Sequence, residues 1–174
     1  MGMIPAWENG KLKPVDKIEV HKRALRHKAV SVFIISGSET LIQKRALSKY
    51  HTPGLWANAC CTHPFWRENP NVCAKRRLEE ELGIKTYDDL IYRDQIEYKA
   101  NVGNGLVEHE LVDIFTLSTG DKNKSKIALN NAEVMDTRWI DLENLKQEIR
   151  ESSERFTPWL KIYLENHAEQ ILNE

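Results

Sequence analysis

The sequence predicts one α/β domain, and three observations support this prediction. Segments rich in β-branched and apolar residues are bounded by turn signals, which is typical of strands. Between these segments, and at the end of the chain, apolar residues recur at helical spacing. The 174 residues are 41% hydrophobic and 29% charged, which suffices for one filled core. We therefore expect residues 1–174 to form a single domain.

The first predicted elements are the two strands of a hairpin. Residues 30–35 are apolar and β-branched, and residues 41–45 follow after a turn at 37–40. A long loop, residues 46–56, then precedes a segment at 58–62 that regains strand character. Long loops beside strand ends commonly carry function, so this loop is a candidate part of a site.

An amphipathic helix is predicted over residues 71–82, with Gly83 as its stop signal. Apolar residues repeat there at every fourth position: Ala74, Leu78 and Leu82. At 100° per residue, Arg77 and Glu81 lie beside this apolar row. We therefore expect Glu81 to face inward.

The second half of the chain predicts further strands and then helices. The strands cover residues 90–98, 106–117 and 133–140. One helix begins near Asp141, and a last one begins at Thr157 and Pro158 and carries an apolar stripe as far as Ile171.

Charge and composition exclude several classes of protein. The formal net charge is −1 and the pI is about 6.6, so there is no overall basic field for nucleic acid. No apolar run approaches the roughly 20 residues of a membrane span, and the start lacks a signal peptide. Three cysteines, two of them adjacent, argue against a disulfide framework. We expect a cytoplasmic protein with reduced thiols and neither a nucleic-acid nor a membrane partner.

Four reactive side chains occur as two alternating pairs, Cys61 with His63 and Glu108 with Glu110. Residues at i and i+2 of a strand point to the same face, so each pair can present both members to one cavity. A solvated sheet edge is the alternative for the glutamates, but apolar residues flank them. Buried together, two carboxylates require a cation or a shared proton. The pattern predicts an active site.

A divalent metal would supply that cation. The possible nitrogen ligands are His21, His27 and His63, whereas His109 points to the other strand face. Three imidazoles and two carboxylates suit a five- or six-coordinate ion better than a tetrahedral structural zinc. Manganese, zinc and magnesium all accept such mixed ligands, so the metal's identity stays open.

The three cysteines have different expected environments. Free cysteines usually pack in the core, and we expect this of Cys60 and Cys73. Cys61 shares a face with His63, beside a cation able to lower its pKa, which favours reactivity.

A second group of residues suggests an anion site. Arg45, Lys49 and Arg77 could converge where the long loop meets the helix, forming a cationic pocket for a diphosphate. Arg77 and Glu81 could instead form an ordinary i, i+4 ion pair. An inward-facing pair would suit phosphate oxygens and Mg²⁺.

Residues 62–84 resemble a degenerate Nudix box. The matching positions are Glu68, Arg76, Leu78, Glu80, Glu81 and Gly83. Thr62 stands where that box has its first glycine, and Arg77 stands where it has a glutamate. These departures argue against the diphosphate hydrolysis that is usual for the superfamily.

Taken with further motifs, the chain resembles the type I isopentenyl-diphosphate delta-isomerase family of the Nudix superfamily. The resemblance runs from Lys17 to Trp159 and rests on the segments 45–49, 53–56, 61–64, 108–110 and 156–159. It implies a Nudix-like α/β/α sandwich with a mixed sheet. The implied metal ligands are His21, His27, His63, Glu108 and Glu110, and Glu81 would hold Mg²⁺ at the substrate diphosphate. The implied diphosphate contacts are Lys17, Arg45, Lys49 and Arg77.

The implied reaction interconverts isopentenyl and dimethylallyl diphosphate, in isoprenoid biosynthesis, through a carbocation-like state. Cys61, Tyr98 and Glu110 would perform the proton transfers, and which group protonates stays open. Trp159, with Trp56 as a second contributor, would offer a π face to the cation. A Nudix hydrolase of a nucleoside or prenyl diphosphate is the alternative function, and a non-catalytic metal-binding domain is the third. The sequence leaves the oligomeric state open.

Overall fold

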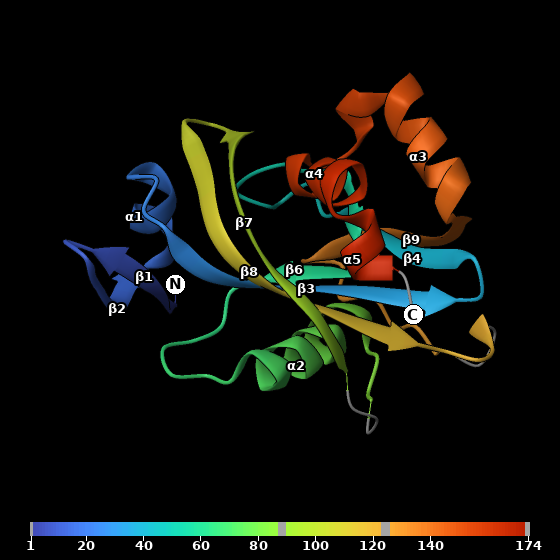
Figure 1. Ribbon diagram of the computed structural model, residues 1–174, viewed down its shortest axis with the longest axis horizontal. Coiled ribbons are helices and arrows are strands. Elements are labelled where there is room, and N and C mark those ends of the chain that lie inside the picture. Colours follow the sequence, from blue (N-terminus) through green and yellow to red (C-terminus); the bar gives the residue numbers. More distant parts are fainter. Residues whose placement is uncertain (1, 87–89, 123–125, 173–174) are drawn as a thin grey trace.

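The computed structural model describes residues 2–86, 90–122 and 126–172 (Figure 1). The strands are β1 (Met3–Glu8), β2 (Lys11–Asp16), β3 (His27–Ser36), β4 (Glu39–Arg45), β5 (Trp56–Asn58), β6 (Cys60–Thr62), β7 (Ile91–Gly103), β8 (Leu106–Ser118) and β9 (Val134–Asp141). The helices are α1 (Lys17–Lys22), α2 (Pro70–Leu82), α3 (Leu142–Glu151), α4 (Pro158–Asn166) and α5 (Ala168–Leu172), with a 3₁₀ turn at Ser153–Arg155.

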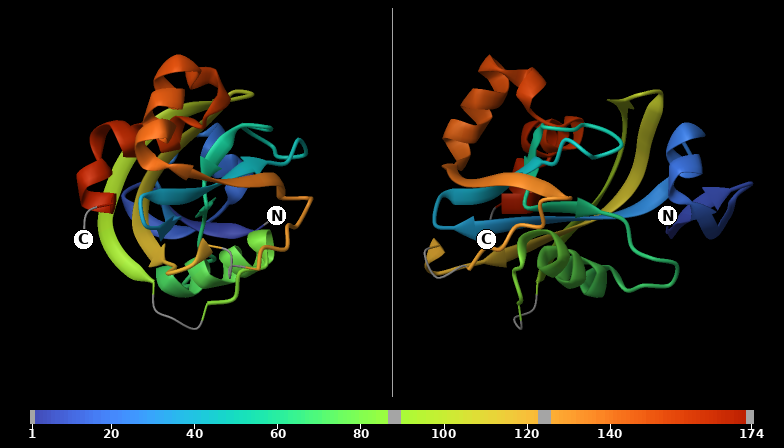
Figure 2. Two further views of the ribbon diagram at one scale, coloured as in Figure 1. Left: turned by 90° about the vertical axis from the view of Figure 1, so that its right-hand side faces the viewer. Right: turned by 180° about the vertical axis from the view of Figure 1, so that it is seen from behind.

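The strands form one mixed sheet that lies between two helical layers. Strand β3 pairs in parallel with β8 and antiparallel with β6, while β4 pairs with β5 and β9. Helix α2 covers one face of the sheet, and α3, α4 and α5 cover the other (Figures 1 and 2). This is the α/β/α sandwich expected from the sequence.

Alternation along β3 builds both cores. Val30, Val32 and Ile34 pack with α2, whereas Ala29 and Phe33 pack with the C-terminal helices. Because successive side chains of a strand point to opposite faces, one apolar strand supplies both layers.

Strand β6 shows the same alternation with two cysteines. Cys60 lies in the core beneath α2, and Cys61 packs on the opposite side. The register on β3 places Cys61 opposite Ser31. Buried Asn58 supports that register, because its Nδ2 lies 2.9 Å from three oxygens: Ser31 Oγ and the backbone oxygens of Val32 and Cys60.

Most predicted elements are present. Helix α2 begins after Asn69, whose side chain caps it, and it ends at Gly83 in the left-handed conformation (φ +67°). The predicted β3–β4 hairpin exists, but the two strands pair only near its tip, at Ile35 with Thr40 and Ser36 with Glu39. The reason is that the rest of β3 is bonded to β6 and β8.

Four features differ from the sequence prediction. The segment predicted as one strand at 58–62 forms two short strands, β5 paired with β4 and β6 paired with β3, and β5 begins inside the predicted loop. The β1–β2 hairpin and α1 were not predicted, because β2 is largely exposed, contains Pro14 and has little apolar patterning. Strand β7 continues to Gly103, beyond the expected end, where it turns into β8. The last predicted helix is interrupted at His167. No helix in the described part of the chain has the length and apolarity needed to cross a membrane.

Candidate functional site

Two buried carboxylates lie side by side on β8. Glu108 and Glu110 are 2% and 1% exposed, so they do not form a solvated edge. His109, between them, turns to the opposite face and lies 3.1 Å from Glu97. The sequence prediction of an inward-facing glutamate pair is confirmed.

Three histidines from separate elements surround Glu110. His21 lies in the last turn of α1, His27 begins β3 opposite Glu110, and His63 follows β6; their ring centroids are 4.9 to 5.1 Å apart. Backbone oxygens fix two of the rings, since His21 Nδ1 lies 2.7 Å from Lys17 O and His27 Nδ1 lies 2.8 Å from Leu25 O. A carbonyl only accepts, so each Nδ1 carries hydrogen and each Nε2 of a neutral ring offers a lone pair.

These lone pairs converge in a way that fits a cation. His27 Nε2 lies 3.2 Å from His63 Nε2, and His63 Nε2 lies 3.0 Å from Glu110 Oε1. Within the described residues, buried His21 Nε2 has no hydrogen-bond partner. One ligand atom from each of these four side chains lies within 4.8 Å of the others. Burial and the neighbouring His27 lower the pKa of His21 to about 4, which keeps it neutral. The cluster is suited to a divalent metal.

Tyr98 connects the two carboxylates. Its hydroxyl lies 2.8 Å from Glu108 Oε2 and 2.8 Å from Glu110 Oε2. Burial, and then the charge of Glu110, raises the pKa of Glu108 well above its usual range. Burial also acts to raise the pKa of Glu110, but the neighbouring His27 and His63 rings outweigh it and hold that pKa low. The two glutamates therefore differ in their preferred protonation state.

Cys61 is a protonated thiol in this environment. Burial, and then the charges of Glu110 and Glu108, raises its pKa well above the usual range. The protein groups thus act against the lowered pKa expected from the sequence, because desolvation and two carboxylates both disfavour a thiolate. A thiol that keeps its proton is suited to acid/base chemistry. Cys60 and Cys73 are buried in the α2 core, as expected.

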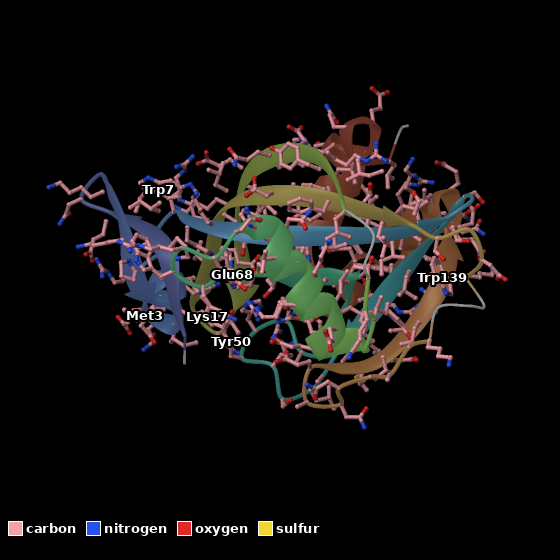
Figure 3. All side chains as sticks on the ribbon, turned by 90° about the horizontal axis from the view of Figure 1, so that it is seen from below. Met3, Trp7, Lys17, Tyr50, Glu68 and Trp139 are labelled. Atoms are coloured by element: carbon pink, nitrogen blue, oxygen red, sulfur yellow. The ribbon has the colours of Figure 1, made fainter. Side chains whose placement is uncertain are left out.

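A pocket opens beside the cluster. Its lining includes Lys17, Arg45, Lys49, Tyr50, His51, Cys61, Thr62, His63, Arg77, Glu108, Glu110 and Trp159. Lys17 and Tyr50 lie together in Figure 3, with Lys17 Nζ 4.7 Å from the centre of the Tyr50 ring. The structure thus brings together four cations from α1, the end of β4, the following loop and α2.

Burial and the neighbouring cations lower the pKa of Lys17. Burial, and then the charges of Lys49, Arg77 and Arg45, lowers the pKa of Lys17 to about 8. Such a cluster without a bound anion is electrostatically unfavourable, so it favours an anionic ligand.

Arg77 and Glu81 form the i, i+4 ion pair that the sequence offered as an alternative to a diphosphate contact. Arg77 Nη2 lies 2.5 Å from Glu81 Oε1, and Gln43 donates to Glu81 Oε2 at 2.9 Å. Glu81 is 4% exposed, which confirms its inward orientation. Glu133, which was not predicted, accepts from Lys49 and lies 3.5 Å from Arg77.

Comparisons with known proteins agree with this geometry. The NUDIX domain family matches residues 25–160. Isopentenyl-diphosphate Delta-isomerase from Dinoroseobacter shibae is 57% identical over 169 residues, covering 97% of this chain and 94% of the relative. The enzyme of that name from Cereibacter sphaeroides is 55% identical and covers 99% and 96%. The chain belongs to the isopentenyl-diphosphate Delta-isomerase family.

Solved structures show the fold that this isomerase family shares with hydrolases. The MutT protein from Methanosarcina mazei superposes with a TM-score of 0.62 at 15% identity, covering 80% of this chain and 91% of that one. A MutT NUDIX hydrolase from Burkholderia pseudomallei gives 0.62 at 19%, covering 82% and 98%. The α/β/α architecture is thus common to both, and the site residues must distinguish the isomerase family.

In this isomerase-family chain, the box residues on the outer side of α2 form ion pairs. Arg76 binds Glu68 at 2.7 Å and Glu80 at 3.1 Å. These contacts join the loop before α2 to the helix itself, so here they serve structure.

Two parts of the isomerase pocket differ from the sequence interpretation. Trp159 is 1% exposed and lines the pocket, but Trp56 packs beside Arg138 and does not appear in that lining. Tyr50 and His51 line it without having been proposed as site residues. No local pattern marks them, because the fold of the long loop brings them there.

Proposed function

We propose that Cys61 and Glu110 are the two acid/base groups with which this isomerase-family chain interconverts isopentenyl and dimethylallyl diphosphate. The terminal alkene carbon gains a proton from one group, which leaves the tertiary carbon cationic, and the chain CH₂ on the other side of that carbon loses a proton to the other group. The main support for this proposal is that one pocket contains the protonated thiol of Cys61, the carboxylate of Glu110 with its low pKa, and a cluster of cations. Which group acts as acid depends on the direction of the reaction.

Tyr98 and Trp159 have supporting roles in this proposal. Tyr98 holds the Glu110 carboxylate through its 2.8 Å contact and thereby aims the other oxygen. Trp159 presents a buried aromatic ring to the carbocation-like state, which a desolvated π face stabilises by about 2 kcal/mol. The enclosing side chains exclude water that would trap the cation.

The diphosphate is assigned to Lys17, Arg45, Lys49 and Arg77. Guanidinium groups match phosphate oxygens in pairs, whereas ammonium groups act as point charges. In the free protein Arg77 is paired with Glu80, Glu81 and Glu133, so substrate oxygens would replace part of these contacts.

The residues proposed to hold the first metal are His21, His27, His63, Glu108 and Glu110. A bound divalent ion, manganese, zinc or magnesium, supplies the positive charge that compensates the two buried carboxylates. Glu81 is the proposed protein ligand of a Mg²⁺ ion that accompanies the diphosphate. The cytoplasmic location is also a proposal, and the free thiols Cys60, Cys61 and Cys73 fit a reducing compartment.

Product analysis tests the reaction directly. The protein is incubated with isopentenyl diphosphate and Mg²⁺ or Mn²⁺, and the products are followed by proton and phosphorus NMR. We expect dimethylallyl diphosphate with both phosphates retained. Free phosphate would indicate the hydrolase alternative, and unchanged substrate would indicate a non-catalytic metal-binding domain.

A further inference from the structure

A fourth histidine, His51, lies against Glu108 and beside His21 of the histidine cluster. His51 is 3% exposed, and its Nε2 lies 3.4 Å from Glu108 Oε1. Its ring stacks on His21, with centroids 5.7 Å apart and planes at 28°, and meets Trp159 edge-on. The acid/base and diphosphate roles assigned above do not use it.

The backbone of His51 is fixed by a residue of the cationic pocket. Arg45 Nη2 donates to His51 O at 3.1 Å, and Arg45 Nε donates to Thr52 O at 3.2 Å. Thr52 has a left-handed conformation (φ +46°), which is costly for a side chain with a branched Cβ and persists here because neighbouring contacts hold it. The loop therefore presents the His51 ring in one defined position.

Each ring nitrogen of His51 lies near an oxygen atom. His51 Nδ1 lies 2.9 Å from Thr52 Oγ1, and a hydroxyl can donate to it. When Nδ1 accepts from Thr52, Nε2 carries the hydrogen and can donate to Glu108 Oε1, which lies 3.4 Å away. Tyr98 contacts the other oxygen of the same carboxylate at 2.8 Å.

We propose that His51 is a positioning residue that holds Glu108 in a metal-binding orientation. With Tyr98 on Oε2 and His51 on Oε1, rotation of the carboxylate is restrained from both sides. Groups that orient metal ligands in this way typically change metal affinity by 10- to 100-fold. Because Arg45 contacts the loop that carries His51, the same residue connects the diphosphate pocket with the metal centre. The inference rests on the proposed metal centre.

The test compares two substitutions with opposite properties. His51→Phe keeps an aromatic ring for Trp159 but removes the N–H, whereas His51→Gln loses the ring but keeps a donor of similar reach. Mn²⁺ binding is measured by titration calorimetry and by electron paramagnetic resonance on the full chain. His109→Phe, on the outer face of β8, is the matched control.

We expect one Mn²⁺ per wild-type chain and a Kd about tenfold higher in His51→Phe, with an altered resonance spectrum. His51→Gln should recover most of the affinity, and His109→Phe should equal the wild type. Circular dichroism establishes that each variant is folded. If His51→Phe does not fold, His51→Asn, too short to reach Glu108, replaces it with the same expectation.

Three results would overturn the inference. A wild-type Kd in His51→Phe would show that the ring only packs, and equal losses in both His51 variants would show that a donor at this position does not hold Glu108. Two ions in the wild type and one in His51→Phe would make His51 a ligand, since His21, His51 and Glu108 also present atoms within 4.8 Å. A wild-type chain that binds no Mn²⁺ would instead overturn the proposed metal centre itself.

Discussion

At the scale of single residues, burial determines which groups of the pocket are charged. Cys61 keeps its proton because desolvation and two carboxylates disfavour the thiolate. Lys17 is a weaker base than usual because it is buried among other cations. Both shifts arise from neighbours distant in sequence, so residue spacing alone could not indicate them.

The first prediction concerns the proposed acid/base pair. Cys61→Ala and Glu110→Gln should each lower kcat by roughly 10²–10⁴-fold, because each removes one proton carrier. The variants should retain the circular dichroism spectrum of the wild type. Cys60→Ala is the matched control: it removes the adjacent thiol, lowers stability and leaves kcat nearly unchanged. Wild-type rates in either of the first two variants would contradict the assignment.

The second prediction uses the lowered pKa of Lys17. A lysine with a pKa of about 8 loses its charge as the pH rises through that value, so diphosphate affinity should fall there. We expect kcat/KM, which reports the free enzyme, to decline above pH 8. In Lys17→Arg the cation persists, and the decline should shift to higher pH or disappear. An unchanged decline in Lys17→Arg would assign it to another group.

At the scale of elements, helix α2 separates two functions on two sides. Arg77 faces the pocket with Glu81, whereas the neighbouring Arg76 binds Glu68 on the outer side, and Glu80 accepts from both arginines. Two adjacent arginines thus allow binding and stability to be tested separately.

The third prediction concerns this pair of arginines. Arg77→Gln should raise the KM for isopentenyl diphosphate about tenfold or more with a smaller effect on kcat, because a charge-assisted contact is lost. Arg76→Gln should leave the KM unchanged and lower the midpoint of urea unfolding. Steady-state kinetics and urea titrations distinguish the two. Equal KM values in Arg77→Gln and the wild type would count against a diphosphate contact.

The fourth prediction concerns the end of α2. At Gly83, a Cβ would lie 2.7 Å from Ala128 Cβ, and the backbone is left-handed. Gly83→Ala should therefore lower the free energy of unfolding by roughly 1–3 kcal/mol. Gly120 has open space around it, so Gly120→Ala is the control and should differ little from the wild type. A urea titration measures both.

The elements differed in how far the sequence could predict them. Helix α2 and the buried strands follow from local patterns, namely the row of Ala74, Leu78 and Leu82 and the apolar run in β3. The short helix α1 and the exposed strand β2 lack such patterns and depend on tertiary contacts. The same holds for His51, whose place depends on Arg45 fixing the loop.

At the scale of the whole molecule, the side chains of the proposed metal site come from parts of the chain that are far apart in sequence. Its ligand atoms come from α1, the start of β3, the segment after β6, and β8. An unfolded chain cannot bring them together, so a metal that binds here stabilises the folded state by mass action.

The fifth prediction follows from this linkage. Mn²⁺ at a free concentration 100 times its Kd should add about 2.7 kcal/mol to the free energy of unfolding, and a chelator should remove it. Differential scanning calorimetry or urea titration measures the gain. His63→Ala should abolish it, whereas His109→Ala should retain it. Equal stabilisation of all three proteins would place the ion elsewhere.

The side chain of Asn58 has a consequence for how faithfully the pocket is assembled. Cys60 and Cys61 are adjacent, so a shift of the β6 register by one residue would turn Cys60, in place of Cys61, toward the pocket. The slipped chain would have the same atoms near the glutamates but a misaligned scaffold around them. By binding three oxygens at once, Asn58 discriminates between these nearly degenerate pairings. Asn58 thereby favours the pairing in which Cys61, and not Cys60, lines the pocket.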